Sequence, residues 1–284
     1  MRLGKSDISD NNIYIVAEIG INHNGSIELA KAMINIAKKA GCHAVKFQKR
    51  TIDDVYTKEE LDKQRESIFG NTNRDLKNGL EFNIEQYKEI VNYCNKIEID
   101  FFASPWDCKS VDFLENCNIC CYKIASACIT DINLLEKIKQ TEKPVIISTG
   151  MSSINEIRKA VDIFDKDNVI LLSCTSTYPN KDEEINLNKI KTLKKLFPGY
   201  LIGYSGHEED ILPSIIAASF GCVMIERHIT LSKLLWGSDQ MASLEPSQLN
   251  ELVNSMKRVK LLLGKGEIGI IENELPIKEK LRKY

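Results

Sequence analysis

Short runs of apolar residues alternate with amphipathic stretches along most of the chain. Eight runs are strand-like, and most lead through a polar turn into a stretch whose apolar residues recur at helical spacing. In the first such stretch Leu29, Met33, Ile36 and Ala40 recur in this way, and Gly41 supplies a C-terminal stop. The predicted strands cover residues 13–20, 44–48, 100–105, 121–126, 144–150, 169–177, 201–207 and 223–230. The predicted helices cover residues 26–41, 83–98, 133–142, 153–164, 187–197, 210–221 and 245–264.

This alternation predicts a parallel sheet covered by helices, because the strands are mostly apolar throughout and not on one face alone. Eight strand–helix units in about 250 residues fit a closed (β/α)8 barrel, the TIM barrel, better than an open doubly wound sheet. No G-x-G-x-x-G motif follows the first strand, which removes the usual sign of a dinucleotide-binding sheet. We therefore predict an α/β fold in which residues 1–264 form the barrel and residues 265–284 are a tail outside it.

One segment does not fit the eightfold pattern. Residues 51–81 are rich in Asp, Lys, Asn and Arg and are too long for an ordinary connection. We expect an irregular loop over the mouth of the barrel, meaning the end at which the C-terminal ends of the strands lie.

Composition excludes several classes of protein. The chain has 284 residues, of which 43% are hydrophobic and 27% charged, as expected of a globular protein. A formal net charge of −2 gives no reason to expect nucleic acid or an anionic membrane as partner. The N-terminal residues lack the apolar core of a signal peptide, and no apolar run approaches the ~20 residues that span a bilayer, so we expect a cytoplasmic protein.

The nine cysteines are scattered over strand-like and helix-like segments. We expect reduced, mostly buried thiols. Cys117 and Cys120 form a C-x-x-C that lacks a second pair or a nearby histidine, so a zinc site is not expected there.

Polar residues lie late in nearly every predicted strand, where the chemistry of a TIM barrel is found. Side chains two positions apart on a strand share a face, so alternate residues at these strand ends point together toward the barrel axis. Arg227 lies between two such residues and is therefore expected to point outward. The candidate residues are Glu18, Lys46, Ser104, Lys123, Ser126, Ser148, Ser176, Tyr178, Ser205, His207, Glu226 and His228.

His207 and His228 end neighbouring strands and are candidates to bind one metal ion. A single histidine at a strand end is more often a hydrogen-bonded structural residue. Two histidines on adjacent ends, with Glu226 between them, make a metal site an equal alternative.

Lys46 and Lys123 lie in apolar runs, and burying an ammonium without a partner is costly. We therefore expect a phosphate or carboxylate group of a substrate to meet them, with hydroxyl donors from the nearby serines. On the same argument, replacing Lys123 by Met is expected to stabilise the ligand-free chain.

Eight segments together resemble the sialic acid synthase family, which condenses phosphoenolpyruvate with an N-acylated hexosamine to make nonulosonic acids. They run in order from about Ile13 to Gly264, almost the whole chain, and they are "AEIGINHNG", "VKFQ", "YKIAS", "STGM", "CTSTYP", "GYSGH", "ERHIT" and "GSDQMASLEP".

The resemblance implies a divalent metal, Mn²⁺ or Mg²⁺, held by His207 and His228. It implies sugar contacts from Glu18, Tyr178 and Asp239, and Glu18 and Glu226 are candidates for proton transfer or orientation of the sugar. The phosphoenolpyruvate contacts that it implies are Lys46, Lys123, Ser104, Ser126, Ser148, Ser176 and Ser205. The implied reaction joins phosphoenolpyruvate to an open-chain sugar aldehyde and yields a 3-deoxy 2-keto sugar acid and phosphate.

The sequence also departs from the family pattern. Cys128 stands where well-known members have a glutamate, and Ser176 where asparagine is common. Typical members continue into an antifreeze-like domain that reaches across a dimer, and we expect this chain to be a short form that lacks this domain. We expect a homodimer in which the 51–81 loop, the tail or both shield the active site. Two alternatives remain: a phosphoenolpyruvate-dependent synthase that extends another sugar, and a non-catalytic sugar-binding relative.

Overall fold

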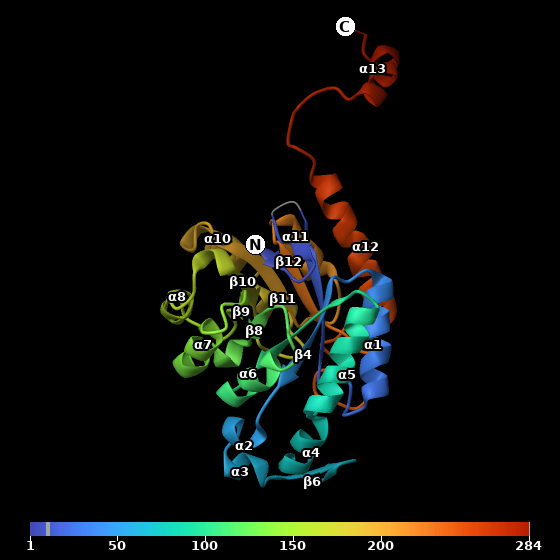
Figure 1. Ribbon diagram of the computed structural model, residues 1–284. Helices are drawn as coiled ribbons and strands as arrows, with labels where there is room; N and C mark the ends of the chain where they lie inside the picture. The colour runs from blue at the N-terminus through green and yellow to red at the C-terminus, as the bar shows by residue number, and fades with distance from the viewer. Residues whose placement is uncertain (10–11, 284) are drawn as a thin grey trace.

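Eight parallel strands close into a barrel in the computed structural model, which describes residues 1–9 and 12–283 (Figure 1). The strands follow one another around the barrel in chain order, and the last pairs with the first. This confirms the predicted TIM barrel. The strands are β3 (Tyr14–Gly20), β4 (Ala44–Lys49), β7 (Asp100–Pro105), β8 (Tyr122–Ile124), β9 (Val145–Ser148), β10 (Val169–Cys174), β11 (Leu201–Gly206) and β12 (Met224–His228).

Helices surround the barrel and bury their apolar faces against the strands. In the first helix the Ser26 side chain accepts a hydrogen bond from the Leu29 N–H, and Gly41 ends the helix with a φ of 94°. One barrel helix, α6, has no counterpart among the predicted ones. The barrel helices are α1 (Ile27–Ala40), α5 (Ile84–Lys96), α6 (Cys108–Glu115), α7 (Ile132–Lys139), α8 (Ile154–Val161), α10 (Asn188–Leu196), α11 (Leu212–Ser219) and α12 (Pro246–Leu263).

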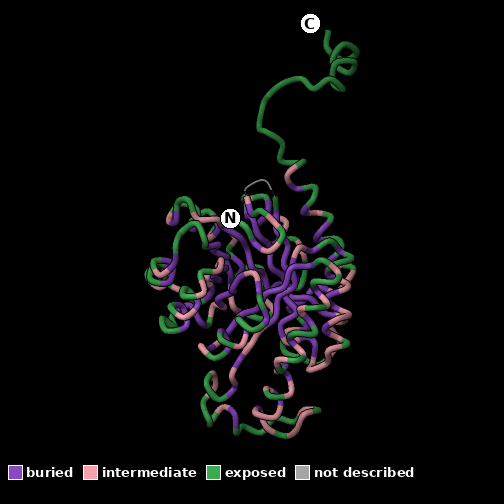
Figure 2. The backbone as a smooth tube through the Cα atoms, viewed as in Figure 1, coloured by how far each residue is buried: buried purple, intermediate pink, exposed green. Residues whose placement is uncertain are grey.

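An apolar layer fills the end of the barrel opposite the mouth. A hairpin of β1 (Arg2–Leu3) and β2 (Ser6–Asp7) carries the buried Leu3 against the first residues of the strands. Tyr14 donates a hydrogen bond of 2.8 Å to Asp100 at this end. Figure 2 shows the buried backbone concentrated in the strands. Because apolar side chains fill most of this end, most of the polar side chains of the barrel interior lie at the mouth.

The predicted irregular loop at 51–81 is ordered, so that prediction was wrong. The segment leaves β4 at the mouth and folds into short helices and a hairpin, held by side-chain contacts such as the bond from Asn73 Nδ2 to the Glu60 carbonyl. Its elements are α2 (Ile52–Val55), α3 (Lys58–Leu61), β5 (Gln64–Ser67), β6 (Gly70–Thr72) and α4 (Asn73–Leu80).

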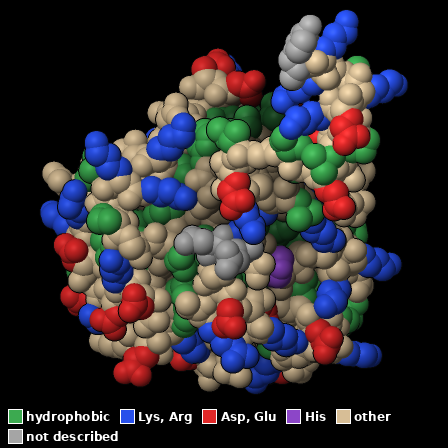
Figure 3. All heavy atoms as spheres, turned by 90° about the horizontal axis from the view of Figure 1, so that it is seen from above, with side chains coloured by type: hydrophobic (Ala, Val, Ile, Leu, Met, Phe, Trp, Pro, Cys, Tyr) green, Lys and Arg blue, Asp and Glu red, His purple; other side chains and the backbone are tan. Residues whose placement is uncertain are grey.

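Helix α12 carries the chain away from the mouth. It begins just after Leu244, whose N–H bonds to the carbonyl of His228, and it ends near the opposite face of the barrel. The tail beyond it contains η3 (Glu272–Glu274) and α13 (Leu275–Leu281), and its described residues are exposed. Figure 3 looks down on this face and shows acidic and basic side chains interspersed over it. The tail therefore leaves the barrel at the end opposite its own mouth; Tyr284 lies outside the described residues.

The remaining elements are short: η1 (Ser126–Cys128), η2 (Lys166–Asn168) and α9 (Asp182–Ile185). All nine cysteines are free thiols, as predicted. None of the helices in the described part of the chain combines the length and apolar character needed to cross a bilayer.

Candidate active site

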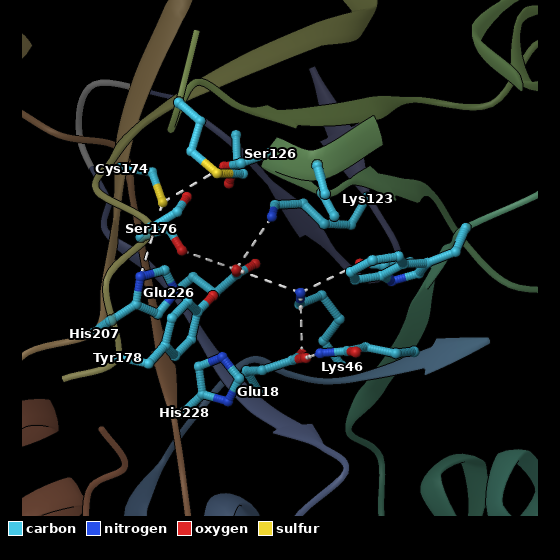
Figure 4. Close-up of a pocket in the computed structure, with 18 residues that line it drawn as sticks. Glu18, Lys46, Lys123, Ser126, Cys174, Ser176, Tyr178, His207, Glu226 and His228 are labelled. Atoms are coloured by element: carbon cyan, nitrogen blue, oxygen red, sulfur yellow. Dashed lines mark hydrogen bonds and ion pairs between the residues drawn. The ribbon is translucent and has the colours of Figure 1, made fainter. Parts of the chain in front are cut away.

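The predicted residues meet in one cavity of about 180 Å³ at the mouth. Figure 4 shows their side chains converging from strands all around the barrel. Of the predicted set, only Asp239 is absent from the lining. The cavity is lined by Glu18, Lys46, Gln48, Ser104, Trp106, Lys123, Ala125, Ser126, Ala127, Ser148, Met151, Cys174, Ser176, Tyr178, Ser205, His207, Glu226 and His228.

Two lysines and two glutamates form a buried cluster at the floor of the cavity. Lys46 Nζ lies 3.1 Å from Glu18 Oε2 and 3.4 Å from Glu226 Oε1. Lys123 Nζ lies 3.2 Å from the same Oε1 atom of Glu226, and Ser205 donates to it at 3.0 Å. Three donors thus converge on one oxygen of Glu226, while its Oε2 atom has no hydrogen-bond partner among the described residues.

The four charged groups differ in how far neighbouring charges offset the cost of keeping them ionised when buried. Burial disfavours ionisation of Glu226, but Lys123 and Lys46 outweigh it and hold the pKa of Glu226 at about 2. Burial raises the pKa of Glu18, against the opposing effect of Lys46. Burial lowers the pKa of Lys123, whereas the two carboxylates outweigh burial at Lys46 and raise its pKa. Glu226 is therefore a fixed carboxylate, and Glu18 is the carboxyl group that more readily holds a proton.

This cluster corrects one argument from the sequence. The burial of Lys46 and Lys123 was expected to require an external anion, but Glu18 and Glu226 already lie against the two ammonium groups. Neighbouring strands make the pairing possible, because Glu18 lies opposite Lys46 in the register of β3 and β4. Burial of the lysines alone is therefore no evidence for a phosphate ligand.

His207 and His228 lie side by side in the cavity, with ring centroids 5.5 Å apart. The Nδ1 atom of His207 lies 2.7 Å from the carbonyl of Thr175, which fixes the ring and leaves its other nitrogen for a ligand. Burial lowers the pKa of His228 well below its usual value, and its buried Nδ1 atom has no hydrogen-bond partner in the described part of the chain. A neutral imidazole with an uncommitted nitrogen atom, as in His228, is suited to binding a divalent metal.

Within the described part of the chain, the two histidines are the groups available for such a metal. Among the described residues, no group of three or more His, Cys, Asp or Glu side chains is arranged to hold an ion. The residues present thus fit a metal bound by two protein ligands, with its other positions open to water or substrate.

Three groups surround the histidines. The ring of Tyr178 lies over His207 with a centroid distance of 3.9 Å and meets His228 edge-on at 5.8 Å. Asp239, although outside the cavity lining, places Oδ2 3.9 Å from Nδ1 of His228. Cys174 Sγ lies 3.9 Å from Nδ1 of His207. Burial disfavours a thiolate at Cys174 and an imidazolium at His207. The attraction between these two charges nevertheless lowers the pKa of Cys174 to about 7 and raises the pKa of His207.

Serine hydroxyl groups also line the cavity. Ser126 follows β8 in η1 and not in the strand as predicted, and its Oγ accepts a hydrogen bond from the Gly150 N–H. Ser104 accepts a hydrogen bond from Lys46 at 3.3 Å. The buried Oγ of Ser148 has no partner among the described residues, so it is available to a ligand.

Sequence reasoning missed Gln48, Trp106 and Cys174, which also line the cavity. Each lies two positions from a predicted residue, namely Lys46, Ser104 and Ser176, so the rule that alternate residues share a face would have found them. Cys128, in contrast, does not face the cavity: it packs in the apolar core, and burial raises the pKa of its thiol to about 12.

A second buried network braces the two histidine-bearing strand ends from outside the barrel. Arg227, which points outward as predicted, pairs with Glu208 at 2.9 Å and donates to the Asp210 carbonyl at 2.6 Å. Glu208 also accepts hydrogen bonds from Tyr204 at 2.9 Å and Ser214 at 3.1 Å.

Comparison with known proteins gives concordant results. The model of the NeuB family matches residues 33–268. The chain is 40% identical over 274 residues to the N-acetylneuraminate-9-phosphate synthase of Mus musculus, covering 95% of this chain and 76% of that protein. It is 35% identical over 280 residues to the N,N'-diacetyllegionaminic acid synthase of Legionella pneumophila, covering 95% and 78%. A solved structure of an N-acetylneuraminic acid synthetase from Leptospira borgpetersenii superimposes with a TM-score of 0.86 at 32% identity, covering 100% of this chain and 98% of that one.

Proposed function

Because the chain belongs to the NeuB family, we propose that its barrel condenses phosphoenolpyruvate with the aldehyde of an open-chain N-acylated hexosamine or a related sugar. The products are phosphate and a 3-deoxy 2-keto sugar acid of the sialic or nonulosonic type. The protein is thus a transferase that forms a carbon–carbon bond. The observation that carries the proposal is the meeting, in one cavity at the mouth, of the lysine–glutamate cluster, the serine hydroxyls and the paired histidines.

The cations and hydroxyl groups are assigned to phosphoenolpyruvate. Lys123 has one carboxylate partner, Glu226, whereas Lys46 has two, so Lys123 retains more capacity to attract an anion. Ser148 offers an uncommitted hydroxyl group, and Ser104, Ser126, Ser176 and Ser205 line the same cavity. Such prearranged donors stabilise the charge that develops on the phosphate as it leaves.

We assign different roles to Glu18 and Glu226. Three donors fix one oxygen of Glu226, and this arrangement suits an anchor that stays ionised and holds both lysines in place. Among the described residues, the carboxylate of Glu18 interacts with Lys46 and Gln48, and we assign Glu18 to proton transfer and to contact with the sugar. Tyr178 and Asp239, on the histidine side, are assigned to the sugar.

We further propose that the cofactor is a divalent metal, Mn²⁺ or Mg²⁺, held by His207 and His228. Bound there, the metal would polarise the sugar aldehyde as a Lewis acid. Thr175 orients the ring of His207 through its carbonyl, and Tyr178 packs over that ring.

The finer proposal for partners is a second copy of this chain. The described end of α12 and the tail expose large aliphatic side chains, among them Leu261, Ile268 and Leu281. Since the tail leaves the barrel opposite its own mouth, any shielding by the tail would act on the mouth of a partner. The 51–81 segment is the part of the same chain that borders its mouth.

The test is release of phosphate from phosphoenolpyruvate in the presence of Mn²⁺ and a panel of aldoses. Release that depends on an N-acylated hexosamine, with a 2-keto acid as co-product, is the expected result. Release with a pentose or tetrose phosphate instead would favour the synthase that extends another sugar. No release with any aldose, despite binding of a sugar, would favour the non-catalytic relative.

A further inference from the structure

The segment between β10 and α9 lies at the mouth of the barrel and brings Ser176 and Tyr178 into the active-site cavity. Residues 175–181 form neither helix nor strand, so they lack the regular backbone hydrogen bonds of those elements. Yet the ring of Tyr178 packs over His207 at a centroid distance of 3.9 Å (Figure 4). Side-chain contacts must therefore hold this segment in place.

Asn180 makes these contacts from within the segment. Its side chain is buried, and its Nδ2 atom lies 2.8 Å from the carbonyl oxygen of Thr177 and 2.7 Å from the hydroxyl oxygen of the same residue. Nδ2 also lies 3.4 Å from the carbonyl oxygen of Thr175. A backbone carbonyl accepts hydrogen bonds and cannot donate them, so the amide nitrogen, and not the amide oxygen, faces both carbonyls. The bonds to Thr177 close a short loop around Tyr178.

Asn180 is joined to His207 by two routes. Its backbone N–H donates to the His207 carbonyl at 3.0 Å. Its side chain reaches the Thr175 carbonyl, which is the group that Nδ1 of His207 contacts at 2.7 Å. Because a carbonyl is an acceptor, Nδ1 carries the hydrogen atom of this bond, and Nε2 of the neutral ring keeps its electron pair for a ligand. The orientation and the tautomer of the His207 ring thus depend on where the Thr175 carbonyl lies.

Thr175 has a second support at its hydroxyl group. Lys189 of α10 places Nζ 2.7 Å from Oγ1 of Thr175, and this oxygen atom lies 3.2 Å from the Glu184 carbonyl. In the described part of the chain, the side chains that contact the carbonyl of Thr175 are those of His207 and Asn180. Removing the Asn180 amide is therefore expected to loosen this carbonyl while the hydroxyl contacts of Thr175 remain.

We propose that Asn180 is a positioning residue of the active site, whose side-chain amide holds the segment after β10 so that His207 presents Nε2 to the metal and Tyr178 stays against the cavity. The proposal rests on the proposed function and adds to it a residue that does not line the cavity. An acidic or apolar side chain at this position could not donate the same hydrogen bonds.

Two variants remove the amide donor. Asn180→Asp keeps the shape of the side chain and replaces the donor by an oxygen atom, and Asn180→Ala removes the group without placing oxygen atoms against one another. In calorimetry without substrates, the Mn²⁺ affinity of both variants is expected to fall about 10- to 100-fold. At saturating Mn²⁺, kcat should fall while the Michaelis constant for phosphoenolpyruvate changes less than about threefold, because most groups assigned to that substrate lie on other strands.

The ring of His207 gives a readout that needs neither metal nor turnover. In the metal-free chain at mildly alkaline pH, NMR of isotopically labelled histidine rings is expected to show His207 in the single tautomer that carries hydrogen on Nδ1. In both variants the signal should move toward that of an imidazole that exchanges between its two tautomers. His207→Gln identifies the signal among those of the four histidines.

Asn116→Asp is the matched control. The Asn116 amide also donates to a backbone carbonyl, that of Asp112 at 2.8 Å, but it does so at the end of α6 away from the mouth. This variant should bind Mn²⁺ and turn over like the wild type, and circular dichroism establishes that each variant is folded.

An unchanged His207 ring spectrum in both Asn180 variants would overturn the proposal, whatever happens to turnover. So would a Mn²⁺ affinity within about threefold of the wild type in both, or equal losses in Asn116→Asp. If the wild-type chain releases no phosphate with any aldose, the proposed function fails, and if it binds no Mn²⁺, the metal assignment fails. In both cases the ring spectrum still decides whether Asn180 positions His207.

Discussion

Arg227 and Glu208 form a buried ion pair of 2.9 Å that joins the residue before His228 to the residue after His207. The two strands that carry the histidines are thus tied together on the outside of the barrel. The geometry of the histidine pair depends on this tie as well as on the backbone bonds between β11 and β12.

Removing Arg227 should leave Glu208 as an unpaired buried charge. We expect Arg227→Met to lower the free energy of unfolding by about 3–5 kcal/mol in chemical denaturation. The Mn²⁺ affinity measured by calorimetry should fall about 10- to 100-fold, because the rings lose their support. Adding Glu208→Gln should recover part of the stability. Lys31→Met is the control, because it breaks the more exposed ion pair with Glu89, and it should lower the free energy of unfolding by less than about 1 kcal/mol. An equal loss of unfolding free energy in Lys31→Met and Arg227→Met would refute the special role of the buried pair.

Metal binding should depend on both histidines. His207→Ala and His228→Ala are each expected to abolish Mn²⁺ binding in calorimetry and phosphate release from phosphoenolpyruvate, since each removes one of two protein ligands. Circular dichroism should report a folded barrel in both variants. His43→Gln, at the opposite end of the barrel near Ile15, should bind the metal normally. Full activity in either alanine variant would refute the assignment of the metal site to these two histidines.

Lys123→Met tests the anion site. The Michaelis constant for phosphoenolpyruvate should rise about 10- to 100-fold, the loss expected for one charge-assisted contact. The stabilisation expected from the sequence alone should not occur, because the variant leaves Glu226 with Lys46 as its one cationic partner. Steady-state kinetics and denaturation measure the two effects. Lys143→Met, which breaks a pair with Glu115 far from the cavity, is the control; an unchanged Michaelis constant in Lys123→Met would place the phosphate elsewhere.

Acid should weaken the fold through His23. Burial, followed by the charge of Arg50, lowers the pKa of this histidine from 6.5 to about 3, and its ring stacks on Phe82 at 4.1 Å. Between these two pKa values the unfolded chain binds a proton that the folded chain does not, so stability is lost as the pH falls below about 6.5.

The corresponding variant is His23→Gln, which cannot take up a proton. Its loss of unfolding free energy between pH 7.5 and pH 4.5 should be about 2.5 kcal/mol smaller than that of the wild type. Phe82→Leu disturbs the same packing but keeps His23, so it should retain the wild-type pH dependence. Parallel stability curves for His23→Gln and the wild type would show that His23 does not contribute.

Assembly can be tested by ending the chain after Gly264. Light scattering of the full chain is expected to give the mass of a dimer. The shortened chain should lose the dimer or turn over more slowly, whereas its melting temperature should change little because the described tail residues are exposed. A full chain that is monomeric, together with full activity of the shortened one, would disprove the proposed role of the tail.

Periodicity was sufficient to predict the barrel and most of its site. Eight apolar runs gave the strands, and the alternation of side chains placed residues such as Ser205 and Glu226 in one cavity. The pairing of Glu18 with Lys46 could not be predicted with certainty, because it depends on which strands become neighbours and on their register. The order of the 51–81 segment rests on contacts such as that between Asn73 and Glu60, which leave no periodic signal.

The lysine–glutamate cluster also bears on how the chain reaches its folded state. Lys46 and Lys123 belong to early strands, and of the two carboxylates that neutralise them, Glu226 belongs to the last. A half-formed barrel that lacked β12 would enclose two ammonium groups with Glu18 as their one partner, an arrangement that burial penalises. Partial assemblies are thereby disfavoured, and docking of β12 closes the ring and balances its interior charge in the same event. During synthesis, the charges of the lysine–glutamate cluster would balance only when the eighth strand has left the ribosome.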